Sequence, residues 1–212
     1  MRKSITVCLT ILPLIVTILL VPYMINSVPM HYNFAGEVDR YGSKYEELFF
    51  PLLIIILSML FSLYKNKNRD DRNSELMDYL QWVILLIFNI TQYYFLFKDF
   101  ATANFQVDIR LLSGIMGAAI ILAGILTRYS KRNDIIGLRT KWSKCSDLTW
   151  EKSNHFASVL FVLAGLLIII MSVANVSNYI FIIDVCIVCV VSVLSVIGSY
   201  HFYRQEKVEQ GN

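Results

Sequence analysis

The sequence predicts an all-α membrane protein with six transmembrane helices and with its N- and C-termini in the cytoplasm. Of the 212 residues, 56% are hydrophobic, and the mean hydropathy of +0.56 exceeds that of soluble domains of this length. The hydrophobic residues form six blocks, each close to the ~20 residues with which a helix crosses a bilayer. These blocks are Ile5–Ile25, Leu48–Tyr64, Leu76–Phe97, Leu111–Thr127, Phe156–Ala174 and Tyr179–Phe202.

The blocks are predicted to be helices because a chain in lipid must satisfy its own backbone hydrogen bonds. A closed β-barrel would need alternating apolar and polar residues, and the blocks do not alternate. The first block is too long for the core of a signal peptide, and Tyr23-Met24-Ile25-Asn26 follows it in place of a small-residue cleavage site. We therefore expect a retained first helix and a single six-helix membrane domain over residues 1–212.

The positions of the basic residues predict the orientation of the chain. With the N-terminus inside, fifteen of the nineteen Lys and Arg residues lie in inner segments and four in outer loops. This bias follows the positive-inside rule and places both termini in the cytoplasm. The formal net charge of +3 is then explained by topology and by anionic lipid headgroups, and it predicts no direct binding of nucleic acid.

The longest outer loop, residues 26–47, is expected to be partly ordered. Met30–Phe34 alternates apolar and polar residues, which predicts a short extended piece. Gly36 and Gly42 are predicted to supply turns. Ser43–Glu46 has capping-box spacing and is expected to start the second helix. The connectors 65–75 and 98–108 are interpreted as loops, and the connector 175–178 is interpreted as a tight turn.

The fourth block carries small residues at a helical spacing. Ser113 and Gly117 are four residues apart, and so are Gly114 and Ala118. Small residues at this spacing let another helix approach closely. We expect that helix to be a neighbour in the same bundle.

No catalytic, metal-binding or cofactor-binding constellation is found, so we expect the protein not to be an enzyme. The sequence has none of the common hydrolase, metalloprotease or phosphate-loop motifs. Its three histidines fall in different segments. The four cysteines are expected to be free, because three lie in predicted helices and one in an inner loop. Cys186 and Cys189 have redox spacing but are expected to pack within an apolar helix.

Three polar residues lie inside the predicted spans and admit two interpretations. Asp184 is about one turn from the outer end of the sixth helix, and Asn89 and Gln92 share a face of the third. They could line a polar path, as in a small transporter or permease-like protein. The favoured interpretation is that Asp184 is hydrated at the interface and that Asn89 and Gln92 hydrogen-bond between helices.

The inner segment 128–155 is unusually polar and holds seven of the Lys and Arg residues. Arg128, Lys131 and Arg132 suit the C-terminal end of the fourth helix and contact with anionic lipids. Ser146 is predicted to cap the fifth helix. The orientation of the chain does not explain the remaining polar residues of this segment. They could hold the connection between helices four and five in shape, or they could contact a cytoplasmic partner. This set is Asn133, Gly137, Arg139, Thr140, Trp150, Asn154 and His155.

Two segments together resemble a known family. Residues 28–44, with Val28-Pro29-Met30-His31-Tyr32-Asn33 and Asp39-Arg40-Tyr41-Gly42, resemble the exoplasmic segment of DUF1648 membrane proteins. Residues 133–157, with Ile136-Gly137-Leu138-Arg139-Thr140 and Asn154-His155-Phe156-Ala157, resemble the cytoplasmic motif of the SdpI immunity family. Their order, the chain length and the predicted six spans also fit that family.

The resemblance implies a protein of a Gram-positive cell membrane that gives immunity to a secreted, bacteriocin-like peptide toxin. It also implies possible signalling, in which a cytoplasmic ArsR-like repressor is drawn to the membrane. The toxin would meet the outer side, where the candidate residues are Pro29, His31, Asn33, Gly36, Asp39 and Asp184. The repressor would meet the polar set of segment 128–155. The oligomeric state is not predicted.

Overall fold

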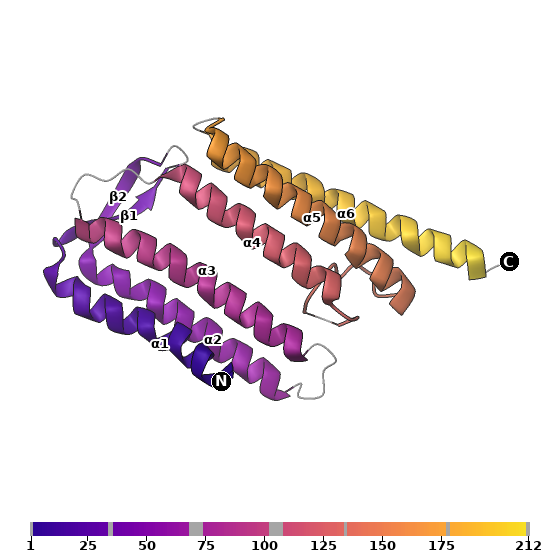
Figure 1. The fold of residues 1–212 in the computed structure, drawn as a ribbon, viewed down its shortest axis with the longest axis horizontal. Helices are drawn as coiled ribbons and strands as arrows, with labels where there is room; N and C mark the ends of the chain where they lie inside the picture. Colours follow the sequence, from indigo (N-terminus) through magenta and orange to yellow (C-terminus); the bar gives the residue numbers. More distant parts are fainter. Residues whose placement is uncertain are drawn as a thin grey trace. The chain divides into compact units, whose positions relative to one another are not determined.

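The computed structural model describes residues 2–33, 36–67, 74–101, 108–133, 135–176 and 179–210. The chain divides into two compact units, Met1–Ile109 and Arg110–Asn212, which we call the N-terminal and C-terminal units. Each unit contains three long helices (Figure 1). The expectation of a single domain over residues 1–212 stays a prediction, and each unit is described by itself.

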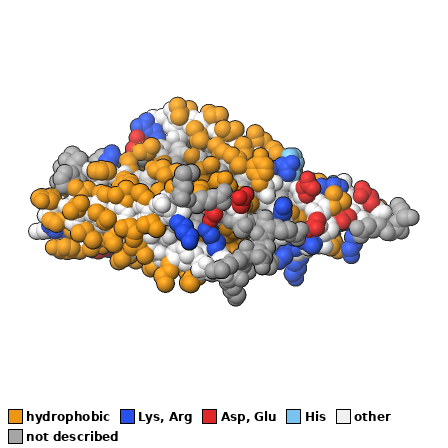
Figure 2. Space-filling model, turned by 60° about the horizontal axis from the view of Figure 1, so that its bottom comes forward, with side chains coloured by type: hydrophobic (Ala, Val, Ile, Leu, Met, Phe, Trp, Pro, Cys, Tyr) orange, Lys and Arg blue, Asp and Glu red, His pale blue; other side chains and the backbone are white. Residues whose placement is uncertain are grey.

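All six predicted helices are confirmed. They are α1 (Arg2–Leu20), α2 (Phe49–Lys67), α3 (Ser74–Ala101), α4 (Ile109–Tyr129), α5 (Asp147–Ala174) and α6 (Ile180–Gln210). Each is long and apolar enough to cross a membrane. Hydrophobic side chains also cover most of the described surface on the face in Figure 2. The chain is therefore a multi-pass membrane protein, because such a surface is stable only against lipid.

Three helix boundaries differ from the apolar blocks for local reasons. The first helix ends at Leu20 rather than Ile25, because Pro22 lies in a 3-10 turn, Val21–Tyr23, that follows it. The fifth helix begins at Asp147, where the Ser146 side chain accepts a hydrogen bond from the Thr149 amide, as the predicted cap requires. The sixth helix continues to Gln210 through polar residues that a search for apolar blocks excludes.

The segment between α1 and α2 forms a β-hairpin. Strands β1 (Ser27–Tyr32) and β2 (Val38–Ser43) pair antiparallel, so the predicted extended piece is confirmed and its partner strand was missed. Gly36 lies in the turn with a φ of 80°. The prediction of a turn at Gly42 is wrong, because Gly42 pairs with Val28 inside the sheet. A Cβ on Gly42 would lie 2.4 Å from a carboxylate oxygen of Glu46, so a larger residue there would have to displace the Glu46 side chain.

The hairpin is anchored to the ends of α1 and α3. Val28 is fully buried in a cluster with Leu96 on α3. The rings of Tyr32 and Phe95 lie 5.7 Å apart. Lys44 is nearly buried, and its ammonium donates to the Met24 carbonyl at 3.2 Å. The predicted capping box of Ser43 is present and begins a 3-10 helix, Lys44–Leu48, that leads into α2.

Polar side chains join the helices of the N-terminal unit. Thr10 on α1 donates to Ser58 on α2 at 2.8 Å. Gln81 on α3, which is 1% exposed, donates to the same Ser58 hydroxyl at 3.4 Å. Toward the end of α2, Lys65 forms an ion pair with Asp78 of α3. In a membrane, apolar side chains gain little free energy by packing on another helix instead of on lipid tails, so these polar contacts hold the three helices together.

Glycines bring α4 and α5 together in the C-terminal unit. A Cβ on Gly165 of α5 would lie 2.5 Å from the Gly117 carbonyl oxygen, and one on Gly124 would lie 3.1 Å from the Ser158 carbonyl oxygen. The predicted close approach of a neighbouring helix at the small residues of α4 is thus confirmed. Next to it, the Phe156 ring of α5 occupies the space over Gly198 of α6.

We expect Gly165→Ala to lower the thermal stability of the purified protein in detergent. The added methyl group has to displace the backbone of α4, and overpacking of this kind costs roughly 1–3 kcal/mol. The matched control is Gly114→Ala, because the nearest atom to that Cβ, the Ser172 hydroxyl oxygen, lies at 3.4 Å. Equal melting temperatures for the two variants would contradict the close crossing.

Candidate functional site

The predicted residues of the β-hairpin divide into exposed and buried ones. His31 and Asp39 are exposed on opposite strands, and the His31 Nδ1 lies 2.6 Å from a carboxylate oxygen of Asp39. Asn33 shapes the turn, because its Oδ1 accepts from the Glu37 amide at 3.0 Å. Pro29 and Gly36 are buried. Of the predicted hairpin residues, His31 and Asp39 are therefore the two that are exposed.

Asp184 lies one turn inside α6 and is fully buried. One of its carboxylate oxygens accepts a hydrogen bond from the Ser113 hydroxyl of α4 at 2.6 Å. The other oxygen is buried and has no hydrogen-bond partner within the described ranges. Asp184 is therefore a contact between α4 and α6, and the expectation that it is hydrated at the interface is wrong, because neighbouring side chains enclose it.

Asn89 and Gln92 connect helices of the N-terminal unit. The Asn89 amide donates to the Leu9 carbonyl of α1 at 2.9 Å, and the Gln92 amide donates to the Thr17 hydroxyl of α1 at 2.7 Å. Hydrogen bonding between helices, the favoured interpretation, is confirmed for both residues. Asp184 belongs to the other unit. Each of the three side chains thus has a packing role in its own unit.

The connection between α4 and α5 is a folded loop, residues 130–146, and we call it the α4–α5 loop. Asn133 closes its first turn, since its Oδ1 accepts from the amides of Ile135 at 2.6 Å and Ile136 at 2.7 Å. Gly137 follows with a φ of 102°, a conformation that favours glycine. A Cβ on Gly137 would also lie 2.4 Å from the Asn154 Oδ1.

Two buried residues of α5 form hydrogen bonds to the backbone of this loop. Asn154 is 1% exposed, and its Oδ1 accepts from the Leu138 amide at 2.6 Å. Trp150 is 3% exposed, and its indole Nε1 donates to the Ser130 carbonyl at 2.8 Å. These hydrogen bonds satisfy loop backbone groups that would otherwise be buried unpaired. The structure therefore brings Asn133, Gly137, Trp150 and Asn154 together.

A second contact ties the α4–α5 loop to α6. Thr140 and Ser143 bond reciprocally, because each amide donates to the hydroxyl oxygen of the other at 2.9 Å. The Thr140 hydroxyl also lies 2.6 Å from that of Ser199, which is fully buried on α6. Sequence reasoning missed Ser143. The Thr-x-x-Ser spacing was the one local signal.

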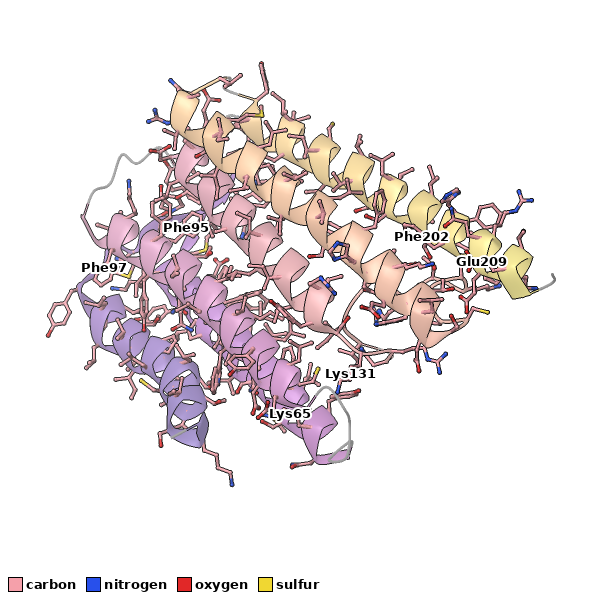
Figure 3. All side chains as sticks on the ribbon, turned by 45° about the vertical axis from the view of Figure 1, so that its right-hand side comes forward. Lys65, Phe95, Phe97, Lys131, Phe202 and Glu209 are labelled. Atoms are coloured by element: carbon pink, nitrogen blue, oxygen red, sulfur yellow. The ribbon has the colours of Figure 1, made fainter. Side chains whose placement is uncertain are left out.

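The end of α6 is fastened to the start of α5 through Glu206. The hydroxyls of Ser146, at 2.6 Å, and Thr149 both donate to one carboxylate oxygen of Glu206. Nearby, Arg132 forms an ion pair with Asp147 at 3.0 Å. Figure 3 labels Lys131 in the loop after α4, and Phe202 and Glu209 on the last turns of α6. Glu206 was missed because it lies 60 residues from Ser146.

Two of the predicted residues face outward. Arg139 and His155 are both exposed. Arg139 borders an open hollow of about 430 Å³ that is also lined by Gly137, Leu138, Thr140 and Lys144. Because two of the five lining residues are cationic, the hollow suits an anionic group. Metal binding has no support in the described ranges, where no group of three or more His, Cys, Asp or Glu side chains is placed to hold an ion.

The architecture defines a multi-pass membrane protein with a strand hairpin after its first helix and a folded polar loop between its fourth and fifth. Residues 130–199 match the SdpI/YfhL protein family, and residues 8–61 match the domain of unknown function DUF1648. The chain therefore carries a segment of the SdpI/YfhL family and a DUF1648 segment. The first match contains the α4–α5 loop and its contact at Ser199, and the second contains the hairpin.

The chain is also similar to a protein named for its role in immunity. The immunity protein SdpI of Bacillus subtilis (strain 168) is 25% identical over 174 residues, which cover 81% of this chain and 82% of that protein. No solved structure matches the chain.

We expect Asn154→Ala to loosen the α4–α5 loop. The substitution removes the acceptor for the Leu138 amide, so trypsin should cleave after Arg139 and Lys144 faster than in the unchanged protein. The control is His155→Ala, which alters the neighbouring residue on the exposed side of α5. Cleavage of the detergent-solubilised protein is followed by mass spectrometry, and equal rates for both variants would contradict the role of Asn154.

Proposed function

We propose that this chain protects a bacterial cell against a secreted peptide toxin that acts on its membrane. The observation that carries this proposal is the similarity to the immunity protein SdpI over four-fifths of both chains. The matches to two family segments, in the order hairpin segment then loop segment, support it. Six apolar helices, each long enough to cross a bilayer, also support the proposal, because such a toxin acts at a membrane.

We further propose that the β-hairpin faces the outside and that both termini and the α4–α5 loop face the cytoplasm. The excess of Lys and Arg in the loop and at the chain ends supports this orientation. The toxin would then meet the hairpin first. Of the predicted hairpin residues, the exposed His31 and Asp39 would contact it, whereas Pro29, Gly36 and Asn33 would keep the hairpin in shape.

A cytoplasmic repressor is the second partner that we propose, on the inner side of the membrane. Arg139 and His155 are exposed and could contact a protein that docks on the α4–α5 loop. Transport is less well supported. The amide groups of Asn89 and Gln92 already bond to α1, and one oxygen of Asp184 bonds to Ser113.

Expression of the chain should raise the survival of a toxin-sensitive Gram-positive strain exposed to an SdpI-type peptide toxin. The double variant His31→Ala/Asp39→Ala should lower that protection several-fold, because it removes the exposed polar pair of the hairpin. Val208→Ala, an exposed change at the end of α6, is the control. Membrane levels are compared by immunoblot. Survival no better than with empty vector, at full membrane levels, would refute toxin neutralisation.

Labelling of single cysteines should reveal the orientation. In a chain whose four native cysteines are changed to serine, Tyr41→Cys on β2 should react with a membrane-impermeant maleimide in whole cells, because Tyr41 is 55% exposed. Lys141→Cys in the α4–α5 loop should react only after the cells are opened. The opposite pattern would reverse the proposed orientation.

A further inference from the structure

Large aromatic side chains lie exposed where α1 ends and α2 begins, at the base of the β-hairpin (Figure 1). Tyr23 is 80% exposed, Tyr45 is 65% exposed and Phe49 is 69% exposed. We call these three residues the aromatic cluster. Rings lose favourable burial energy when they stay in water, so an apolar partner outside the chain would stabilise them.

The contacts of Lys44 bring two members of the aromatic cluster close together. The Lys44 ammonium donates to the carbonyl of Pro22, the residue before Tyr23, at 3.4 Å. The same ammonium lies 5.9 Å from the centroid of the Tyr45 ring. Phe49 follows Tyr45 by four residues, a spacing that puts both on roughly the same side of a helix. The cluster therefore forms one surface.

The aromatic cluster continues an exposed apolar row of α2. After Phe49 come Leu52, Ile56, Leu60 and Leu63, all exposed and spaced by three or four residues, which is one face of a helix. The row is aliphatic along the span and aromatic at its end. Since the aliphatic part faces lipid, the aromatic part stands where that lipid-facing row meets the membrane–water boundary.

Two helices put the tyrosines of the cluster at the same depth. Each residue rises 1.5 Å along α1 and 2.0 Å along the 3-10 turn that follows, so Tyr23 lies about 32 Å from Lys3. Along α2 and the 3-10 helix before it, the same rises put Tyr45 about 32 Å from Lys65. The hydrocarbon core of a bilayer is ~30 Å thick. Because the two lysines mark one boundary of this core, both tyrosines lie at the other.

At that boundary a tyrosine ring can lie among the acyl chains while its hydroxyl bonds to polar groups of the lipid. We propose that the aromatic cluster binds the phospholipid headgroup layer and fixes the base of the β-hairpin at the membrane surface. His31 and Asp39, which lie farther along the strands, then stay in water. A second copy of the chain or a peptide fits less well, because it would cover the end of a row whose remainder faces lipid.

Spin labels can measure the depth of the cluster in the full-length protein in phosphatidylcholine nanodiscs. In a chain whose four native cysteines are changed to serine, Tyr23→Cys and Tyr45→Cys label the cluster. Ile56→Cys marks the lipid core and Asp39→Cys marks water. Oxygen concentrates in lipid and a nickel chelate in water, so the ratio of the two accessibilities reports depth. The ratio for the cluster should be several-fold above that of Asp39 and several-fold below that of Ile56.

Two results would overturn the proposal. A ratio equal to that of Asp39 would put the cluster in water. Low accessibility to both reagents would show that protein, and not lipid, covers it. The single-cysteine variants decide between these outcomes by themselves, because each alters one exposed side chain.

A second measurement tests whether the tyrosines hold this depth. With the label at Phe49→Cys, the double variant Tyr23→Ser/Tyr45→Ser should lower the ratio of oxygen to nickel accessibility at least twofold. The matched control is Tyr41→Ser, which removes an exposed tyrosine of β2 outside the cluster and should leave the ratio unchanged. Equal ratios in the double variant and the control would show that the tyrosines do not anchor the hairpin.

Discussion

Polar groups that leave water for lipid must find partners inside the chain, and this requirement organises both units of the protein. Asn89 and Gln92 of α3 bond to α1, and Ser113 of α4 bonds to Asp184 of α6. Lipid tails compete equally well for apolar side chains, so hydrogen bonds and close backbone contacts decide which helices associate. The polar residues inside the spans, which could also have lined a transport path, are therefore part of the packing.

The same requirement shapes the α4–α5 loop, which bonds to α5 and to α6. The loop bends back toward α6 instead of extending into water, so its backbone groups need partners. Asn154 and Trp150 supply them from α5, and Ser199 bonds to the loop from α6. The segment by which the chain resembles its family is thus mainly a set of buried hydrogen bonds, with Arg139 and His155 left on the outside.

In both predicted functional regions, the hairpin and the α4–α5 loop, some of the predicted residues are buried and others are exposed. In the hairpin, Pro29 and Gly36 are buried while His31 and Asp39 are exposed. In the loop, Asn154 is buried while Arg139 is exposed. Each region holds its backbone with one group of residues and presents another to the surroundings. A substitution in the first group acts through the shape of the region, and one in the second acts on the contact itself.

The amino-acid pattern was enough to predict the six helices, because lipid imposes a length and a composition on each span. It was also enough to predict the caps at Ser43 and Ser146, because a cap depends on residues that are neighbours in the chain. It also located the small residues of α4 that pack on α5. The packed helices were needed to show that Asp184 is buried against Ser113, that Thr140 contacts Ser199, and that Glu206 bonds α6 to the start of α5. These partners lie 57 to 71 residues apart, and no local spacing encodes a contact that forms only when two helices are packed side by side.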